Sequence, residues 1–380
     1  MRDLFVGFSS LGWQQPVMYC IGFVLIWLAI KKEYEPLLLL PIGFGAILVN
    51  LPLSFVGVPA VAGESNGFLK ILYDAGIATE LFPLLIFVGV GAMIDFGPLF
   101  KNPLMIFFGA AAQLGIFITM FVATLPPFNF SLKEAASVGI IGAADGPTSI
   151  YVALRFAPKY LAAISVAAYS YMSLVPIIQP PVVKLLTTKA ERRIHMEYHE
   201  SSVPKWLKVI FPILVTMIAG FVAPISVPLI GSLMFGNLIR ESGVMEKLSQ
   251  TAQNELASIV TLLLGITIGS SMTAANFLDW RTILIMAMGL VAFIFDTAGG
   301  VIFAKAVNLF LPKAKQINPM IGACGISAFP MSARIIQKMA SEEERGNIIL
   351  MQAIGANVSG QIGSIIAGGM VLALVPLFAS

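Results

Sequence analysis

Residues 139–151 read GIIGAADGPTSIY and place an acid, glycines, a proline and hydroxyls inside an apolar span that covers residues 135–156. At a helical rise of about 1.5 Å per residue, Asp145 lies roughly 15 Å from the charges on either side, near the middle of a hydrocarbon core of roughly 30 Å. Pro147 removes helical hydrogen bonds beside it. The stretch therefore predicts a helix that is broken at membrane depth and carries a carboxylate at the break.

An acid at this depth indicates an ion site. A carboxylate is costly in hydrocarbon unless it is paired, and carbonyls freed by a break can turn inward. Because His and Cys are missing from the stretch, its oxygen ligands suit a hard cation such as Na⁺ better than a transition metal. The alternative is that Asp145 is a protonated acid, or a helix cap satisfied by the hydroxyls of Thr148 and Ser149.

The composition is that of a membrane protein. Of 380 residues, 58% are hydrophobic and 11% are charged, and the mean hydropathy is +0.90, whereas about 25% of a soluble domain is charged. The net charge of +3 is spread out and gives no basis for nucleic-acid binding. Cys20 and Cys324 are too few for a disulfide framework, and the N-terminus lacks the pattern of a removable signal peptide.

Apolar runs and polar interruptions predict an all-α polytopic membrane protein with about ten or eleven transmembrane segments. One of these segments is expected to run from Tyr160 to Ile178 and to stop at Pro180-Pro181. The predicted regions are N-terminal spans and a loop (1–80), a first repeat core with the Asp145 motif (81–183), a polar loop (184–208), linking spans (209–256) and a second repeat core (257–380).

The polar loop from Lys184 to Lys208 carries an excess of Lys and Arg, which marks the cytoplasmic side. His195 and His199 are four residues apart, so one helical face could present both to a metal. No third ligand follows at a clear spacing, and a solvated helix face is the favoured interpretation. Asp95, at the end of an earlier apolar run, is interpreted as an interfacial cap rather than an ion ligand.

The two halves share their most unusual motif. Gly139, Gly142, Pro147 and Ser149 recur as Gly322, Gly325, Pro330 and Ser332, each displaced by 183 residues. Paired broken spans in two halves are typical of transporters whose ion site lies where the breaks meet. An odd number of crossings in each half would make the repeats inverted, so we expect two inverted repeats whose broken or re-entrant helices meet near the midplane.

The second motif adds polar side chains in apolar surroundings: Asn318, Ser327, Ser332, Arg334 and, farther on, Asn357. The planar guanidinium of Arg334 suits a carboxylate or an anionic substrate. An arginine whose side chain reaches the membrane interface is the equally weighted alternative.

These motifs resemble the beta subunit of the sodium-pumping biotin-dependent decarboxylases, which act on oxaloacetate, methylmalonyl-CoA or glutaconyl-CoA. The resemblance rests on GAADGPT at 142–148, on Tyr171, and on the pattern from Asn318-Pro319 to Arg334, and it covers nearly the whole chain. It implies a multi-pass protein of the inner (cytoplasmic) membrane that decarboxylates carboxybiotin, consumes a proton, releases CO₂ and exports Na⁺.

The resemblance also implies roles for individual residues. Catalytic roles fall on Asp145, Tyr171, Ser327 and Arg334, with Arg334 holding carboxybiotin. Na⁺ ligands would be Asp145, Asn318, Ser327 and Asn357, supported by the backbone of Gly146, Pro147, Gly322 and Gly325. Arg334 can hold the carboxylate, and Tyr171 or Ser327 can pass the proton.

The partners implied are a carboxyltransferase (alpha) subunit, a biotin carrier protein or domain that supplies carboxybiotin, a small single-span gamma or delta subunit and membrane lipid, and a higher oligomer is compatible with them. The competing hypothesis is a stand-alone Na⁺-coupled secondary transporter or Na⁺/H⁺ exchanger of the same repeated architecture, which would use Asp145 in the same way. A channel-like or purely structural subunit would leave both polar breaks without a purpose.

Overall fold

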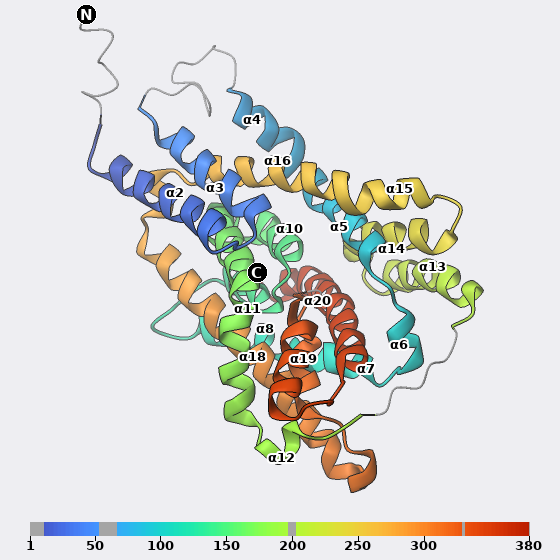
Figure 1. Ribbon diagram of the computed structural model, residues 1–380. Coiled ribbons are helices and arrows are strands. Elements are labelled where there is room, and N and C mark those ends of the chain that lie inside the picture. Colours follow the sequence, from blue (N-terminus) through green and yellow to red (C-terminus); the bar gives the residue numbers. More distant parts are fainter. Residues whose placement is uncertain (1–10, 53–66, 197–202, 329–330, 380) are drawn as a thin grey trace, which may run out of the picture.

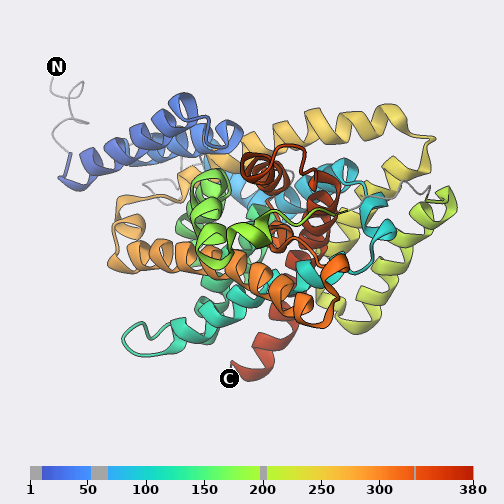
Figure 2. The same cartoon turned by 60° about the horizontal axis from the view of Figure 1, so that its bottom comes forward.

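A computed structural model describes residues 11–52, 67–196, 203–328 and 331–379. In these ranges the chain is helical and contains no strand. Figures 1 and 2 show the long helix α18 (Trp280–Phe310) beside α11 (Leu161–Leu186), with the N-terminal helices along one side.

The first half comprises α2 (Gln14–Lys31), α3 (Pro36–Asn50), α4 (Phe68–Leu72), η2 (Tyr73–Ile77), α5 (Leu81–Met93), α6 (Gly97–Lys101), α7 (Met105–Ala112), α8 (Leu114–Thr124), α9 (Leu132–Gly139), η3 (Ile140–Ala143), α10 (Gly146–Phe156), η4 (Pro158–Tyr160), α11 (Leu161–Leu186) and α12 (Lys189–Arg192).

The second half comprises α13 (Lys205–Val222), η5 (Pro224–Ser226), α14 (Val227–Ser242), α15 (Glu246–Thr251), η6 (Ala252–Leu256), α16 (Ala257–Ser270), α17 (Ala274–Phe277), α18 (Trp280–Phe310), η7 (Lys313–Lys315), η8 (Pro319–Gly325), α19 (Met331–Glu343) and α20 (Leu350–Phe378).

Six described helices are long and apolar enough to cross a membrane, and up to eight spans result if each of two bent helix pairs counts as one. The expected ten or eleven also included short or interrupted pieces, such as α9 to α10, which this length criterion does not admit. α11 continues to Leu186, so its predicted end at Pro180-Pro181 is wrong. Membrane helices tolerate proline where neighbouring elements satisfy the freed groups. α11 instead bends by 65° between Met172 and Leu174, and Pro176 crowds the carbonyl of residue 172.

Two helix pairs with close glycine contacts flank the centre. α3 packs on α16, where a Cβ at Gly269 would lie 2.3 Å from the Ile42 carbonyl, and α14 packs on α5, where a Cβ at Gly91 would lie 1.9 Å from the Leu233 carbonyl. Close backbone approach through small residues is a common way to pack helices in membranes. These two pairs lie outside the centre of the molecule, where the two motifs are found.

The two repeated motifs adopt the same local structure. Each forms a short, tight helix, η3 and η8, followed by an α-helix, α10 and α19. Ser149 Oγ donates to the Ile140 carbonyl and Ser332 Oγ donates to the Ala323 carbonyl, both at 3.4 Å. Both partners shift by the same offset, since 332 − 149 = 183 and 323 − 140 = 183. The two copies of the repeat therefore share a local structure. Their opposite orientation in the membrane stays a prediction.

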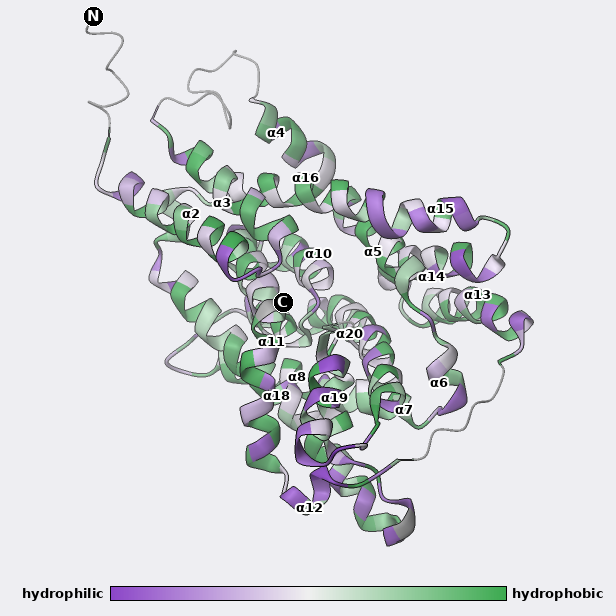
Figure 3. Cartoon of the chain, viewed as in Figure 1, coloured by the Kyte–Doolittle hydropathy of each residue, from purple (hydrophilic) through white to green (hydrophobic). Residues whose placement is uncertain are grey.

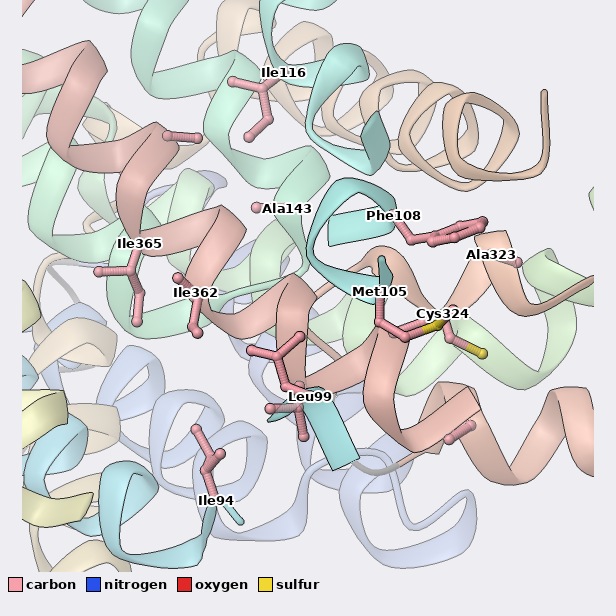
Figure 4. Close-up of a cluster of buried hydrophobic side chains, with 14 of the residues drawn as sticks. Ile94, Leu99, Met105, Phe108, Ile116, Ala143, Ala323, Cys324, Ile362 and Ile365 are labelled. Atoms are coloured by element: carbon pink, nitrogen blue, oxygen red, sulfur yellow. The ribbon is translucent and has the colours of Figure 1, made fainter. Parts of the chain in front are cut away.

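The apolar core surrounds both breaks. Met105 and Phe108 of α7 belong to one buried cluster with Ala323 and Cys324 of η8, and Figure 4 shows these four side chains close together. Polar residues gather on α12 and α19, and separately on α15, as the colouring of Figure 3 shows. The molecule thus has an apolar centre interrupted by two polar breaks, and a polar end at α12 and α19.

Candidate functional site

The carboxylate of Asp145 lies at the start of α10 with only 4% of the residue exposed. The preceding residue, Ala144, has a φ of 52° and turns the chain out of η3. The Thr148 backbone N–H donates to Oδ1 at 3.2 Å, and the Thr148 hydroxyl donates to Oδ2 at 2.7 Å. Asp145 therefore does cap α10, as the alternative hypothesis expected for Thr148, whereas Ser149 donates to the Asp145 backbone carbonyl at 2.8 Å.

A helix cap does not account for the remaining contacts of Oδ2. Ser364 Oγ of α20 donates to it at 2.8 Å, and Ser327 Oγ from the end of the second break lies at 3.4 Å. One carboxylate oxygen therefore faces three hydroxyls that come from three separate parts of the chain. An N-cap needs only local donors, so the convergence indicates a binding site.

The two breaks are joined directly at this point. The Ser327 N–H donates to the Ala143 carbonyl at 3.0 Å, and the Gln361 amide of α20 donates to the Ser327 carbonyl. Asp145 and Ser327, predicted to share a site, are thus brought together.

Asn357 supplies a further oxygen next to the second break. Its amide nitrogen donates to the carbonyls of Cys324 at 3.2 Å and Ile326 at 2.7 Å. Its Oδ1 is buried and has no hydrogen-bond partner in the described chain. An unpaired buried carbonyl is costly, and a bound cation would satisfy it.

Glycines let the surrounding helices approach the site. A Cβ at Gly146 would lie 2.1 Å from the Tyr169 ring, and a Cβ at Gly368 would lie 2.6 Å from the Thr148 methyl group. Gly322 and Gly325 were predicted as supporting backbone. A Cβ at Gly322 would lie 2.1 Å from the Gly300 carbonyl oxygen, and a Cβ at Gly325 would lie 2.3 Å from the Phe108 carbonyl oxygen.

Tyr171 lies immediately before the bend of α11 and is 9% exposed. Its hydroxyl donates a short hydrogen bond to the Met286 carbonyl of α18. In this conformation its proton is therefore directed at α18, and the nearer tyrosine ring, against Gly146, is that of Tyr169.

Asn318 is not among the groups around Asp145. Its amide nitrogen donates to the carbonyls of Arg192 at 2.9 Å and Ile194 at 3.0 Å, and its Oδ1 accepts from the Met320 N–H at 3.1 Å. Asn318 thus joins the beginning of η8 to residues 192–196, which we call the polar segment. Asn318 was predicted to be a Na⁺ ligand, but in this conformation it makes no hydrogen bond with Asp145.

The polar segment is partly packed against α19 and partly exposed. Arg192 is buried, and its Nε donates to Glu343 Oε1 of α19 at 2.7 Å. His195 Nε2 lies 3.3 Å from Glu344 Oε1. His199 lies outside the described residues.

Arg334 lies in the first turn of α19 and is exposed. It forms no ion pair with a described acidic residue, so its guanidinium is available at the polar end of the molecule. It is seven residues beyond Ser327, and the apolar side chains of Met331 and Ile335 on either side of it pack against a small cluster that includes Ala144 and Ile326.

Asp95 lies at the end of α5, where it accepts from the Gly97 N–H at 2.8 Å and from Lys208 Nζ at 3.0 Å. Partial burial disfavours its charged form, but the Gly97 N–H and the Lys208 ammonium hold the pKa of Asp95 below its usual range. Asp95 thus acts as a cap where the chain passes from α5 to α6, as the sequence predicted.

Ser364 and Gln361 were missed by the sequence argument. Ser364 follows Asn357 by seven residues, two helical turns, so it lies on the same face of α20. That spacing could have identified it.

Comparisons with known proteins show the family of the chain. The family model of the Na⁺-transporting oxaloacetate decarboxylase beta subunit matches residues 14–375. The chain belongs to this family. It is 49% identical to the glutaconyl-CoA decarboxylase subunit beta of Acidaminococcus fermentans over 97% of this chain and 95% of that protein.

Two further relatives carry other substrate names. The chain is 47% identical to the methylmalonyl-CoA decarboxylase subunit beta of Veillonella parvula, covering 97% of this chain and 95% of that protein. It is 43% identical to the oxaloacetate decarboxylase beta chain of Klebsiella pneumoniae, with 97% of both covered.

Family membership settles the class of the protein. It is a multi-pass membrane subunit of a sodium-pumping decarboxylase, which works within a multi-subunit complex. The comparisons do not support the stand-alone transporter or exchanger.

Proposed function

We propose that Asp145 binds the transported Na⁺ between the two breaks. The observation that supports this is the convergence of the hydroxyls of Thr148, Ser327 and Ser364 on one carboxylate oxygen. Each hydroxyl now donates to Asp145, and each would offer a lone pair once a cation lies among them. Asn357 Oδ1, which lacks a described partner, would complete the oxygen set.

Asn318 contributes to this site in a different manner. Both ends of its amide are used by described backbone groups. To act as a ligand it would have to leave the carbonyls of Arg192 and Ile194. We propose that it chiefly holds the polar segment against η8.

We further propose that Arg334 receives carboxybiotin from a separate biotin carrier protein or domain. The exposed guanidinium can hold the carboxylate through two parallel hydrogen bonds. Decarboxylation breaks the bond between the ureido nitrogen and the carboxylate carbon, releases CO₂, and places a proton on that nitrogen. Tyr171 or Ser327 passes this proton, for which Tyr171 must leave the Met286 carbonyl.

Na⁺ binding and proton supply are linked at one place. A cation beside Asp145 favours loss of a proton from a neighbouring carboxyl or hydroxyl group, because positive charges repel each other. The arrival of Na⁺ would therefore free the proton that decarboxylation consumes. The inward side is the one with the polar segment and α19, in keeping with its excess of Lys and Arg.

The complex we propose contains a carboxyltransferase (alpha) subunit, the biotin carrier and a small single-span gamma or delta subunit. The first of these would meet the free acid or CoA thioester, so oxaloacetate, methylmalonyl-CoA, glutaconyl-CoA and malonate are all compatible with this chain. The relatives' names divide among three of these substrates.

The test is Asp145→Asn in the purified complex, with Asp95→Asn as the matched control. The Asp145→Asn protein should insert and assemble but lose both Na⁺ transport and Na⁺-dependent decarboxylation. Asp95→Asn should retain both, since Asp95 binds only Gly97 and Lys208 among the contacts described above. Near-parental pumping by Asp145→Asn would refute the site.

A further inference from the structure

Asp296 lies in the middle of α18 and is fully buried. Asp145 and Asp296 are the two buried acids in the described part of the chain. Ionisable residues within transmembrane segments are rare, and they generally serve a function. The site formed by Asp145, Ser327 and Ser364 does not include Asp296.

One oxygen of Asp296 is used by a helix terminus. Oδ1 accepts from the Ile116 N–H at 3.1 Å, at the beginning of α8. The first N–H groups of a helix lack the usual partner within the helix, so this contact serves one of them. An amide oxygen would satisfy this N–H equally well, and a carboxylate is not needed for this purpose.

The other oxygen faces the first break. Oδ2 is buried and has no hydrogen-bond partner in the described chain, and a Cβ at Gly142 would lie only 2.4 Å from it. Gly142 belongs to η3 and precedes Asp145 by three residues. Any movement of η3 therefore changes the surroundings of Asp296 Oδ2 directly.

The repeat supplies an internal comparison. Gln113 Nε2 donates to the Gly325 carbonyl at 3.3 Å. Gly325 matches Gly142 in the repeat, since 325 − 142 = 183. A polar side chain from a neighbouring element thus lies against each of these glycines, an amide at Gly325 and an acid at Gly142. Only the acid can bind and release a proton.

The surroundings favour a proton over a metal ion. No described cation pairs with Asp296, and the described chain gathers no group of three His, Cys, Asp or Glu side chains. The elements packed on α18 include α7, α8, α9, η3, η8 and α11. Their titratable and charged groups, with those of the adjoining break and of α18 itself, are Lys133, Glu134, Asp145, Tyr169, Tyr171, Lys184, Cys324, Arg281 and Lys305.

We propose that Asp296 is a second proton-binding site within the membrane, whose occupancy is set by the position of the first break. While η3 packs as in this structure, a proton on Oδ2 keeps the buried carboxyl neutral. When η3 moves and admits water, the proton leaves. The inference rests on the proposed function in one respect, namely that Na⁺ at Asp145 is what moves the break.

The experiment compares purified complexes carrying Asp296→Asn with the matched packing control Thr297→Val, a buried neighbour on the same helix. The amide introduced by Asp296→Asn keeps the acceptor for the α8 N–H group and fixes the neutral state. We expect Na⁺ binding to release one proton fewer per chain in Asp296→Asn than in the parent and in Thr297→Val. We also expect Asp296→Asn to lose one limb of the pH dependence of turnover. Equal proton release in all three complexes would show that Asp296 is only a helix cap.

A second measurement does not need the Asp296 variant to assemble. In the Asp145→Asn complex, where Na⁺ does not move the first break, the infrared carbonyl band of a buried protonated carboxyl should be present at neutral pH both with and without Na⁺. A missing band would overturn the proposal. This readout requires no Na⁺ pumping, so it stands or fails separately from the proposed function, which fails if Asp145→Asn still transports Na⁺.

Discussion

Ser364 donates a 2.8 Å hydrogen bond to Asp145 Oδ2, although 219 residues separate them in the chain. The bond joins the middle of α20 to the first break. It makes the C-terminal helix part of the proposed cation site, rather than a neighbour of it.

Replacing Ser364 by Ala should weaken Na⁺ binding. A hydrogen bond to a charged group contributes about 1.5–3 kcal/mol, and at roughly 1.4 kcal/mol per tenfold the expected loss of affinity is about one to two orders of magnitude. The measurement is the Na⁺ dependence of decarboxylation in the purified complex. Ser359→Ala is the control, because that buried hydroxyl on the same helix donates only to the Ala356 carbonyl. Identical Na⁺ dependence in both variants would contradict the ligand set.

Arg334→Lys should reduce carboxybiotin decarboxylation by about one to two orders of magnitude, since Lys keeps the charge but loses the paired geometry. Na⁺ affinity should change much less. Arg193→Lys, in the exposed part of the polar segment, should leave both quantities near parental values. If decarboxylation is unchanged in Arg334→Lys, or Na⁺ affinity alone collapses, then Arg334 does not hold the carboxylate.

Gly146→Ala should destabilise the protein and impair turnover, because its Cβ would lie 2.1 Å from the Tyr169 ring beside Asp145. Overpacking of this kind typically costs about 1–3 kcal/mol. Gly220→Ala in α13 is the control: its Cβ would lie 3.6 Å from the nearest side chain, and Ala is the better helix former. Thermal unfolding of both variants in the same detergent would compare them. Equal melting temperatures would show that the Tyr169 ring moves aside at little cost.

Asn318→Ala should release the polar segment, because two carbonyls lose their shared donor. Limited proteolysis after residue 192 should become faster, while Na⁺ affinity should fall less than in Asn357→Ala. The opposite order of affinities, with unchanged proteolysis, would restore Asn318 as a direct ligand.

The broken helices and their contact could be predicted because the signals for both lie in two short stretches of sequence. A proline stands in each motif, Pro147 and Pro330, and the offset of 183 residues between the motifs is visible without a structure. Asp145 and Ser327 could therefore be assigned to one site in advance.

The remainder depended on how the helices are arranged. Ser364 and Gln361 belong to a long apolar helix with no local signal of a break, and only tertiary packing turns them toward Asp145 and Ser327. Asp296 could have been noticed as an acid in the middle of an apolar run. Its contact with Gly142 could not, since the sequence does not say which faces of α18 and η3 meet.

The hydrogen bonds of Asn318 connect the polar segment to the proposed ion site. The polar segment begins at Arg192, Asn318 holds it to the start of η8, and Ser327 follows the other end of η8 beside Asp145. If a carrier protein displaced the polar segment, it would move a short, tightly wound helix that leads to a proposed cation ligand. Docking and opening of the proposed ion site would then be one event, and a pump built in this way would not release CO₂ while the ion stays behind.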